Sequence, residues 1–107
     1  MELSEIIEQL SNPEKLISPE RINILSAHLN GYITDLEEQE WEDQLRASNK
    51  KMELYTEEKT NASAETKWKT TSEFAEWKKT ERLVRRLKRF RADLKDRFQV
   101  LTNTKRF

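Results

Sequence analysis

The only side chain in this sequence that ordinarily titrates near neutral pH is His28, the single histidine among 107 residues. A catalytic histidine works beside a nucleophile or a carboxylate, and a zinc site needs further ligands. No Glu-x-x-His pair accompanies His28, and the sequence contains no cysteine. We therefore interpret His28 as an exposed or half-buried helical residue, and we expect neither a catalytic histidine nor a metal site.

Clustered carboxylates are the second group of side chains that are candidates for a functional site. Glu37, Glu38 and Glu40 offer oxygen ligands of the kind that a divalent cation prefers. Consecutive helical residues point in different directions, however, so we interpret this cluster as a solvated or salt-bridged helix face. The only glycine, Gly31, stands alone, which excludes a phosphate-binding glycine loop. We expect no enzyme activity, no cofactor and no small-molecule substrate.

A dense run of Lys and Arg over residues 78–91 is the strongest candidate for a binding site. Basic side chains on one helix face neutralise phosphates, and Trp77 and Phe90 can stack on bases. In the other interpretation, the arginines pair with an acidic helix and the two aromatic rings belong to the core. The candidate contacts with nucleic acid or an acidic partner are Arg82, Arg85, Arg86, Arg89, Arg91, Lys95, Arg97, Lys105 and Arg106.

The two charge signs are separated along the chain. Residues 1–77 contain 17 acids and 8 Lys or Arg, whereas residues 78–107 contain 3 acids and 12 Lys or Arg. The formal net charge of zero conceals this division. The densest acidic run lies at residues 35–43, so any fold that brings it beside residues 78–91 pairs the two signs.

The elements that position these side chains are predicted to be helices. Strand-rich and loop-rich proteins need many turn residues, but this sequence has one glycine and two prolines. After Gly31 there is neither glycine nor proline, and good helix formers dominate the rest of the chain. We therefore predict an all-α protein.

Capping residues predict where the helices begin. Ser18-Pro19-Glu20 combines an N-cap, a proline at the first helical position and an acid in the first turn. Asn61 or Ser63 is the expected cap of a second long helix. We predict a single domain over residues 1–107, with short N-terminal helices at 1–17, long helices at 19–59 and 63–101, and a frayed tail at 102–107.

A short link between two long helices indicates an antiparallel, coiled-coil-like hairpin preceded by a short N-terminal helical segment. In this register, residues 35–43 lie opposite roughly residues 78–86, so the acidic and basic runs face one another. The predicted core of the hairpin or of an oligomer is Leu25, Leu29, Leu36, Trp41, Trp68, Trp77, Leu87, Phe90, Leu94 and Phe98.

The apolar stripe of the first long helix changes side along its length. Leu36 and Leu45 are separated by nine residues, or about two and a half turns. The helix therefore bends there or is covered on two sides. One seam between two helices also does not hide nine aromatic residues. We expect the short N-terminal helix to cover part of the excess and a second copy to cover the rest, in a four-helix dimer.

The location of the protein is expected to be the cytoplasm. The first residues, MELSEIIEQL, are acidic and lack the long apolar core of a signal peptide. No segment approaches the ~20 apolar residues of a membrane span, so we expect no membrane partner.

Residues Lys59, Asn61 to Glu65, Trp68, Trp77 and Arg82 to Arg91 form a link, an aromatic segment and a basic helix. In this pattern the chain resembles small helical-hairpin proteins encoded by bacteriophages in early or recombination gene clusters. The resemblance covers about two thirds of the chain and implies a partner-binding role in the host cytoplasm, without assigning a role to any residue.

The sequence thus predicts a non-catalytic helical interaction protein that binds a protein partner through a surface of both charge signs. A nucleic-acid-binding accessory factor of replication or recombination, using the basic C-terminal helix, is the alternative. An inhibitor of a host nuclease or polymerase is a further one.

Overall fold

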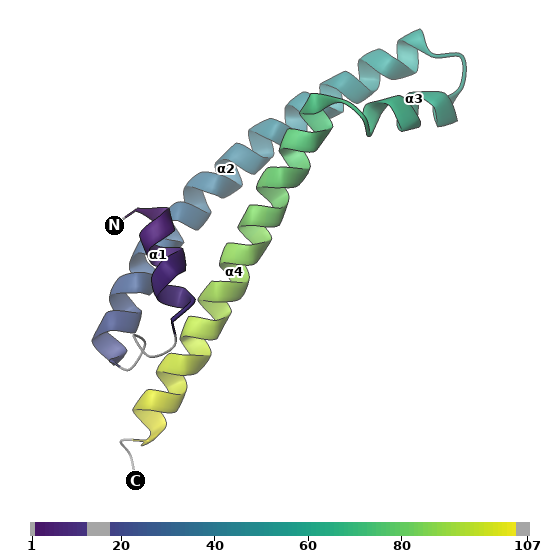
Figure 1. Ribbon diagram of the computed structural model, residues 1–107. Helices are drawn as coiled ribbons and strands as arrows, with labels where there is room; N and C mark the ends of the chain where they lie inside the picture. The colour runs from purple at the N-terminus through teal and green to yellow at the C-terminus, as the bar shows by residue number, and fades with distance from the viewer. Residues whose placement is uncertain (1, 13–17, 105–107) are drawn as a thin grey trace. The chain divides into compact units, whose positions relative to one another are not determined.

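The computed structural model describes residues 2–12 and 18–104, and every regular element within them is a helix (Figure 1). By contacts the chain divides into two compact units: unit 1 comprises residues 1–35 and 85–107, and unit 2 comprises residues 36–84. Within each unit, a segment of α2 lies antiparallel to a segment of α4, which confirms the predicted all-α hairpin. The helices are α1 (Leu3–Leu10), α2 (Pro19–Glu57), α3 (Asn61–Trp68) and α4 (Ser72–Thr104).

The start of α2 follows the predicted capping pattern. Pro19 is the first helical residue, and the Ser18 hydroxyl accepts a hydrogen bond from the backbone N–H of Arg21 at 3.5 Å. Proline has no backbone N–H, but this costs no hydrogen bond at the first helical position, because the first N–H groups of a helix have no acceptor inside the helix. Asn12-Pro13-Glu14 has the same sequence pattern of capping residue, proline and acid, but Pro13 and Glu14 lie outside the described residues.

Unit 1 has an aliphatic core made by three helices. Ile6 of α1 is fully buried, and the Arg21 guanidinium donates two hydrogen bonds to the Gln9 side-chain oxygen, at 3.1 and 2.7 Å. These contacts fix the short α1 to the first turns of α2. The remaining large buried side chains come from α2 and α4: Ile22, Leu25, Leu29, Ile33, Leu87 and Leu94.

Unit 2 has a smaller, aromatic core. Ala47 and Leu54 of α2 pack with Ala64 and Trp68 of α3, and two partly buried rings of α4 complete the cluster. The Trp68 indole N–H donates to the Ala47 carbonyl at 2.7 Å, so the largest side chain of this core keeps its polar atom satisfied. The two α4 rings are Phe74 and Trp77.

The second long helix is not continuous, which corrects the prediction of one helix over 63–101. It divides into α3 and α4 at residues 69–71, where the Thr71 hydroxyl accepts from the Phe74 N–H at 3.3 Å and donates to the Trp68 carbonyl at 2.6 Å. One side chain therefore satisfies backbone groups of both helices.

Other helix ends also differ from the prediction. The N-cap of α3 is Thr60, whose hydroxyl accepts from the Ser63 N–H at 3.1 Å, so neither Asn61 nor Ser63 has that role. α2 ends at Glu57, two residues earlier than predicted, and α4 continues to Thr104 through half of the predicted frayed tail.

The predicted register between α2 and α4 is confirmed at one place in each unit. In unit 1, the Arg91 guanidinium donates to the Asn30 side-chain oxygen at 3.3 Å. In unit 2, the Thr80 hydroxyl donates to the Asp43 carboxylate at 2.7 Å. Both pairs match an antiparallel hairpin that folds near residue 60.

Candidate functional site

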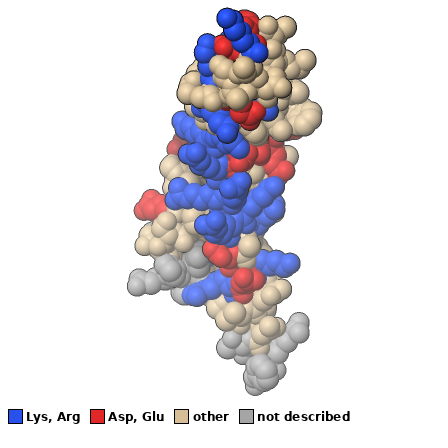
Figure 2. All heavy atoms as spheres, turned by 90° about the vertical axis from the view of Figure 1, so that its right-hand side faces the viewer, with Lys and Arg blue, Asp and Glu red and all other residues tan. Residues whose placement is uncertain are grey.

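The described basic candidates on α4 are all exposed, and Lys and Arg gather on the face of the molecule shown in Figure 2. Arg82 belongs to unit 2, and the others belong to unit 1. Lys105 and Arg106 lie outside the described residues. The candidates described in unit 1 are Arg85, Arg86, Arg89, Arg91, Lys95 and Arg97.

Helical spacing divides these residues among different sides of α4. Arg89 lies four residues after Arg85 and three after Arg86, so these three exposed arginines lie on the outer side of α4. The same stripe continues four and seven residues after Arg89 with the exposed acids Asp93 and Asp96. The purely basic surface of unit 1 is therefore short, about two turns of helix.

The aromatic rings near the basic run already have protein neighbours. The Trp77 ring lies 6.1 Å from that of Trp68 and 5.8 Å from that of Phe74, measured between centroids. The Lys78 ammonium lies 4.2 Å from the Trp77 centroid, and the Arg86 guanidinium lies 5.4 Å from the Phe90 centroid. The contacts of Trp77 agree with its interpretation as a core residue, and Phe90 is half-buried beside the exposed Arg86.

Asp43 lies within the acidic run at residues 35–43, but its side chain is not solvated. It is 5% exposed and is the one buried charged residue among the described residues. Its carboxylate accepts hydrogen bonds from Thr80, from Gln39 at 2.9 Å and from Arg46. Burial raises the pKa of Asp43, but these hydrogen bonds and the Arg46 charge outweigh it and hold the pKa below its usual value. Asp43 thus acts as a polar link between α2 and α4 in unit 2.

Five of the ten residues predicted to form the core are buried, and four more are half-buried. Leu25, Leu29, Leu87 and Leu94 of unit 1 and Trp68 of unit 2 are buried. The half-buried members of the predicted set are Leu36, Trp77, Phe90 and Phe98.

Trp41 is the exception: it lies outside the hairpin core, and its assignment to the core of an oligomer stays a prediction. Its side chain is 62% exposed, whereas the Trp77 ring packs on those of Trp68 and Phe74. Leu45 and Met52 are also exposed, Met52 to 69%. The three side chains follow spacings of four and seven residues, so they lie on one face of α2.

The buried positions of this part of α2 lie on its other side. Asp43, Ala47 and Leu54 repeat the spacing of four and seven, two residues later than the exposed set. Two residues correspond to a rotation of about 200° around the helix axis. In unit 2, α2 therefore carries one apolar face toward α3 and α4 and a second, uncovered apolar face opposite.

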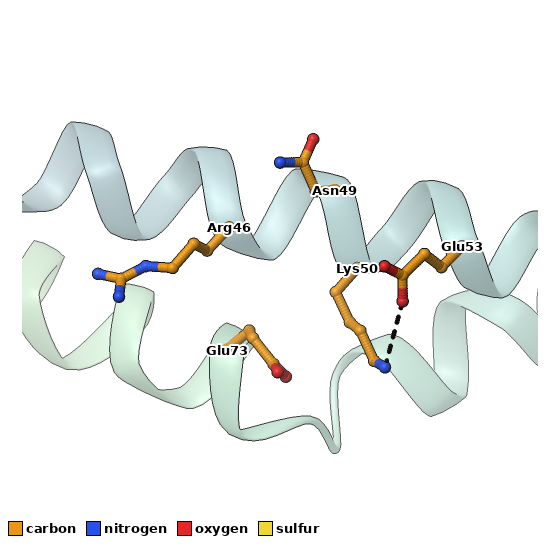
Figure 3. A pocket seen from close by; sticks show the side chains of 5 residues that line it. All are labelled: Arg46, Asn49, Lys50, Glu53 and Glu73. Carbon is orange, nitrogen blue, oxygen red and sulfur yellow. Dashed lines mark hydrogen bonds and ion pairs between the residues drawn. The ribbon is translucent and has the colours of Figure 1, made fainter.

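A polar pocket of about 260 Å³ opens on unit 2 between α2 and α4 (Figure 3). The Lys50 ammonium lies 3.3 Å from the Glu53 carboxylate inside it, so two of its charges already neutralise one another. The other lining residues are Arg46, Asn49 and Glu73. Balanced charges and an open shape give this pocket no preference for an ionic ligand.

His28 is exposed and lines a separate pocket of unit 1 together with Ala27, Gly31, Tyr32 and Asp35. Over the described residues, no three acidic or histidine side chains are grouped closely enough to hold a metal ion. No helix in the described part of the chain has an apolar run able to cross a bilayer.

The chain was compared with protein-family models, curated proteins and solved structures, and no significant match was found in any of the three.

Proposed function

We propose that this chain is a non-catalytic helical interaction protein that binds a protein partner, in keeping with its resemblance to small bacteriophage-encoded proteins. The observation that carries the proposal is the uncovered apolar face of α2 in unit 2, where Trp41 and Met52 are 62% and 69% exposed. Large apolar side chains grouped on a polar surface are typical of protein-binding sites. Exposed charges of both signs, on α2 and on α4, supply orientation and specificity.

Site-specific photo-crosslinking in cells that naturally express the chain tests this function. A photoreactive amino acid is placed at Met52 and, as a control, at Ile24, which is also exposed on α2 but belongs to unit 1. We expect a discrete adduct from position 52, identified by mass spectrometry, and none from position 24. Equal, diffuse labelling at the two positions contradicts a defined protein partner at this face.

A nucleic-acid-binding accessory factor is the second candidate function, supported by the exposed outer stripe of Arg85, Arg86 and Arg89. It predicts micromolar binding to labelled DNA or RNA that weakens steeply with salt, because bound phosphates release counterions. Fluorescence anisotropy measures this. The triple change of the stripe to alanine abolishes such binding, whereas Lys59→Ala, which removes an exposed charge elsewhere, leaves it intact.

A further inference from the structure

We infer that the uncovered face of α2 in unit 2 is a docking site for a basic amphipathic helix of a partner protein. This inference rests on the proposed function and specifies the chemistry of the partner. The docking face is defined by Trp41, Leu45 and Met52, which extend over about three turns of α2, or about 17 Å. That length suits a partner helix of four to five turns.

The apolar side chains of the docking face are suited to a helix. Their spacing of four and seven residues forms a straight ridge, the geometry by which one helix lies along another. Trp41 provides a rigid anchor with a large area, and the unbranched Met52 adapts to irregular partner surfaces. Ser48 lies between them on the same ridge and leaves room for a partner side chain.

The unbalanced charges around the docking face are acidic. Glu38 and Glu42 are exposed beside Trp41, and neither has an ion-pair or hydrogen-bond partner within the described residues. The basic residues of the same part of α2 are already engaged, as Arg46 with Asp43, Lys50 with Glu53, and Lys51 with Glu65.

Lys51 is further occupied by aromatic rings, which keeps it away from the docking face. Its ammonium lies 4.4 Å from the Trp68 ring centroid and 5.7 Å from that of Tyr55. A partner that places Lys or Arg beside its own apolar stripe therefore meets uncompensated carboxylates.

A second copy of this chain fits the docking face less well. In any symmetric pair both copies bring the same exposed acids, Glu38 and Glu42, to the interface. The nearby basic side chains already form ion pairs with other acids of their own chain. The arginines of the outer stripe of α4 do supply positive charge, but the exposed large apolar side chain on that stripe, Val100, lies 11 residues beyond Arg89. Val100 is therefore too far along α4 to cover Trp41 while these arginines meet the acids beside it. Charge thus favours a basic heterologous helix over self-association.

The test uses the full chain and two synthetic 18-residue helical peptides labelled with fluorescein. Both carry the same leucine stripe at helical spacing; one has lysines on its flanks and the other has glutamates. By anisotropy we expect the lysine peptide to bind at least tenfold more tightly than the glutamate peptide. Equal binding of the two peptides, or no binding of either, overturns the inference.

Matched variants locate the site. We expect Met52→Glu to weaken the binding of the lysine peptide at least tenfold. Ile24→Glu, at the exposed control position in unit 1, is expected to leave this affinity unchanged. The double change Glu38→Lys and Glu42→Lys is expected to reverse the preference between peptides. Circular dichroism confirms that each variant is folded. An unchanged affinity of Met52→Glu overturns the site.

Light scattering at micromolar concentration distinguishes self-association through the docking face from binding of a partner helix. We expect the mass of a monomer, in place of the four-helix dimer expected from the sequence alone. A dimer that Met52→Glu converts to monomer assigns the docking face to self-association and overturns the inference. If the crosslinking experiment identifies a partner at Met52 while the lysine peptide fails to bind, the proposed function stands and only the assigned partner chemistry is wrong.

Discussion

At the scale of single residues, two buried polar groups of unit 2, the Asp43 carboxylate and the Trp77 indole N–H, differ in their hydrogen bonding. Asp43 has three hydrogen-bond donors, whereas the Trp77 indole N–H is buried without an acceptor among the described residues. A satisfied buried group stabilises a fold modestly, and an unsatisfied one costs about 1–3 kcal/mol. The two groups therefore predict opposite responses to removal.

Replacing Asp43 with asparagine is expected to lower the free energy of unfolding at pH 7 by about 1–2 kcal/mol, because the charge-assisted bond to Arg46 is lost. The pKa of Asp43 is lowered in the folded state, so the folded protein binds fewer protons there than the unfolded chain. This stabilisation is complete above the unfolded pKa of about 3.9 and disappears as pH falls through the folded value.

Urea denaturation of both proteins at pH 7 and at pH 3 measures this difference. The gap between wild type and Asp43→Asn is expected to narrow at the lower pH. Asp35→Asn, at an exposed carboxylate, serves as the control and is expected to have little effect at pH 7. A gap of equal size at the two pH values contradicts the role assigned to the Asp43 charge.

Trp68→Phe and Trp77→Phe remove the same atoms from the same cluster, but Trp68 is buried and hydrogen-bonded, whereas Trp77 is half-buried and its N–H has no acceptor among the described residues. Trp68 loses its bond to the Ala47 carbonyl, whereas Trp77 loses an N–H that had no partner. We expect Trp68→Phe to cost about 1 kcal/mol more in the free energy of unfolding. Chemical denaturation followed by circular dichroism measures both, and an equal cost refutes the distinction.

At the scale of elements, the division between α3 and α4 depends on one threonine. Thr71→Ala removes the cap of α4 and the bond to the Trp68 carbonyl, and it is expected to destabilise the protein by about 1 kcal/mol. Thr70→Ala removes the same atoms from a neighbouring residue whose hydroxyl donates to the Lys67 carbonyl of α3 but accepts no N–H of α4, and it is expected to cost less. Thermal unfolding of the two variants, compared at equal concentration, checks the order.

The helices were predictable where residue types specify both the backbone and the burial. Ser18-Pro19 marked the start of α2, and the spacing of Leu25 and Leu29 indicated the core of unit 1. The interruption at residues 69–71 was missed because Thr and Ser occur in helix interiors as well as at caps, and no glycine or proline marks the break.

Trp41 was misplaced for a different physical reason. An apolar residue at helical spacing indicates some covered face but does not identify which element covers it. The shift in phase between Leu36 and Leu45 was visible in the sequence, yet only the positions of α3 and α4 show which of the two faces in unit 2 is buried. The burial of Asp43 was likewise hidden, because its donors come partly from the distant residue Thr80.

At the scale of the whole molecule, the chain has two cores but only two long helices. α2 and α4 each run without interruption from one unit into the other. All three tryptophans belong to unit 2, so their fluorescence reports on that unit alone. The effect of a core substitution in unit 1 can therefore be followed by the tryptophan fluorescence of unit 2.

Leu29→Ala, at a fully buried position of unit 1, is expected to lower the free energy of unfolding by about 2–5 kcal/mol. Because the helices are continuous, we expect the transitions seen by circular dichroism and by tryptophan fluorescence to shift together. Ile24→Ala, at an exposed position of the same helix, is the control. A fluorescence midpoint that stays in place shows that the units unfold separately.

The turn at residues 58–60 has a consequence for folding kinetics. Contacts between the two arms of the hairpin join residues ever farther apart in sequence with distance from this turn. Tyr55 and Glu65 are 10 residues apart, Ala47 and Trp68 are 21, Asp43 and Thr80 are 37, and Asn30 and Arg91 are 61. Closing a longer loop costs more chain entropy, so the contacts nearest the turn are the easiest to form first. The hairpin is therefore expected to fold from the turn outward, with the aromatic core of unit 2 as the nucleus and the aliphatic core of unit 1 assembling last.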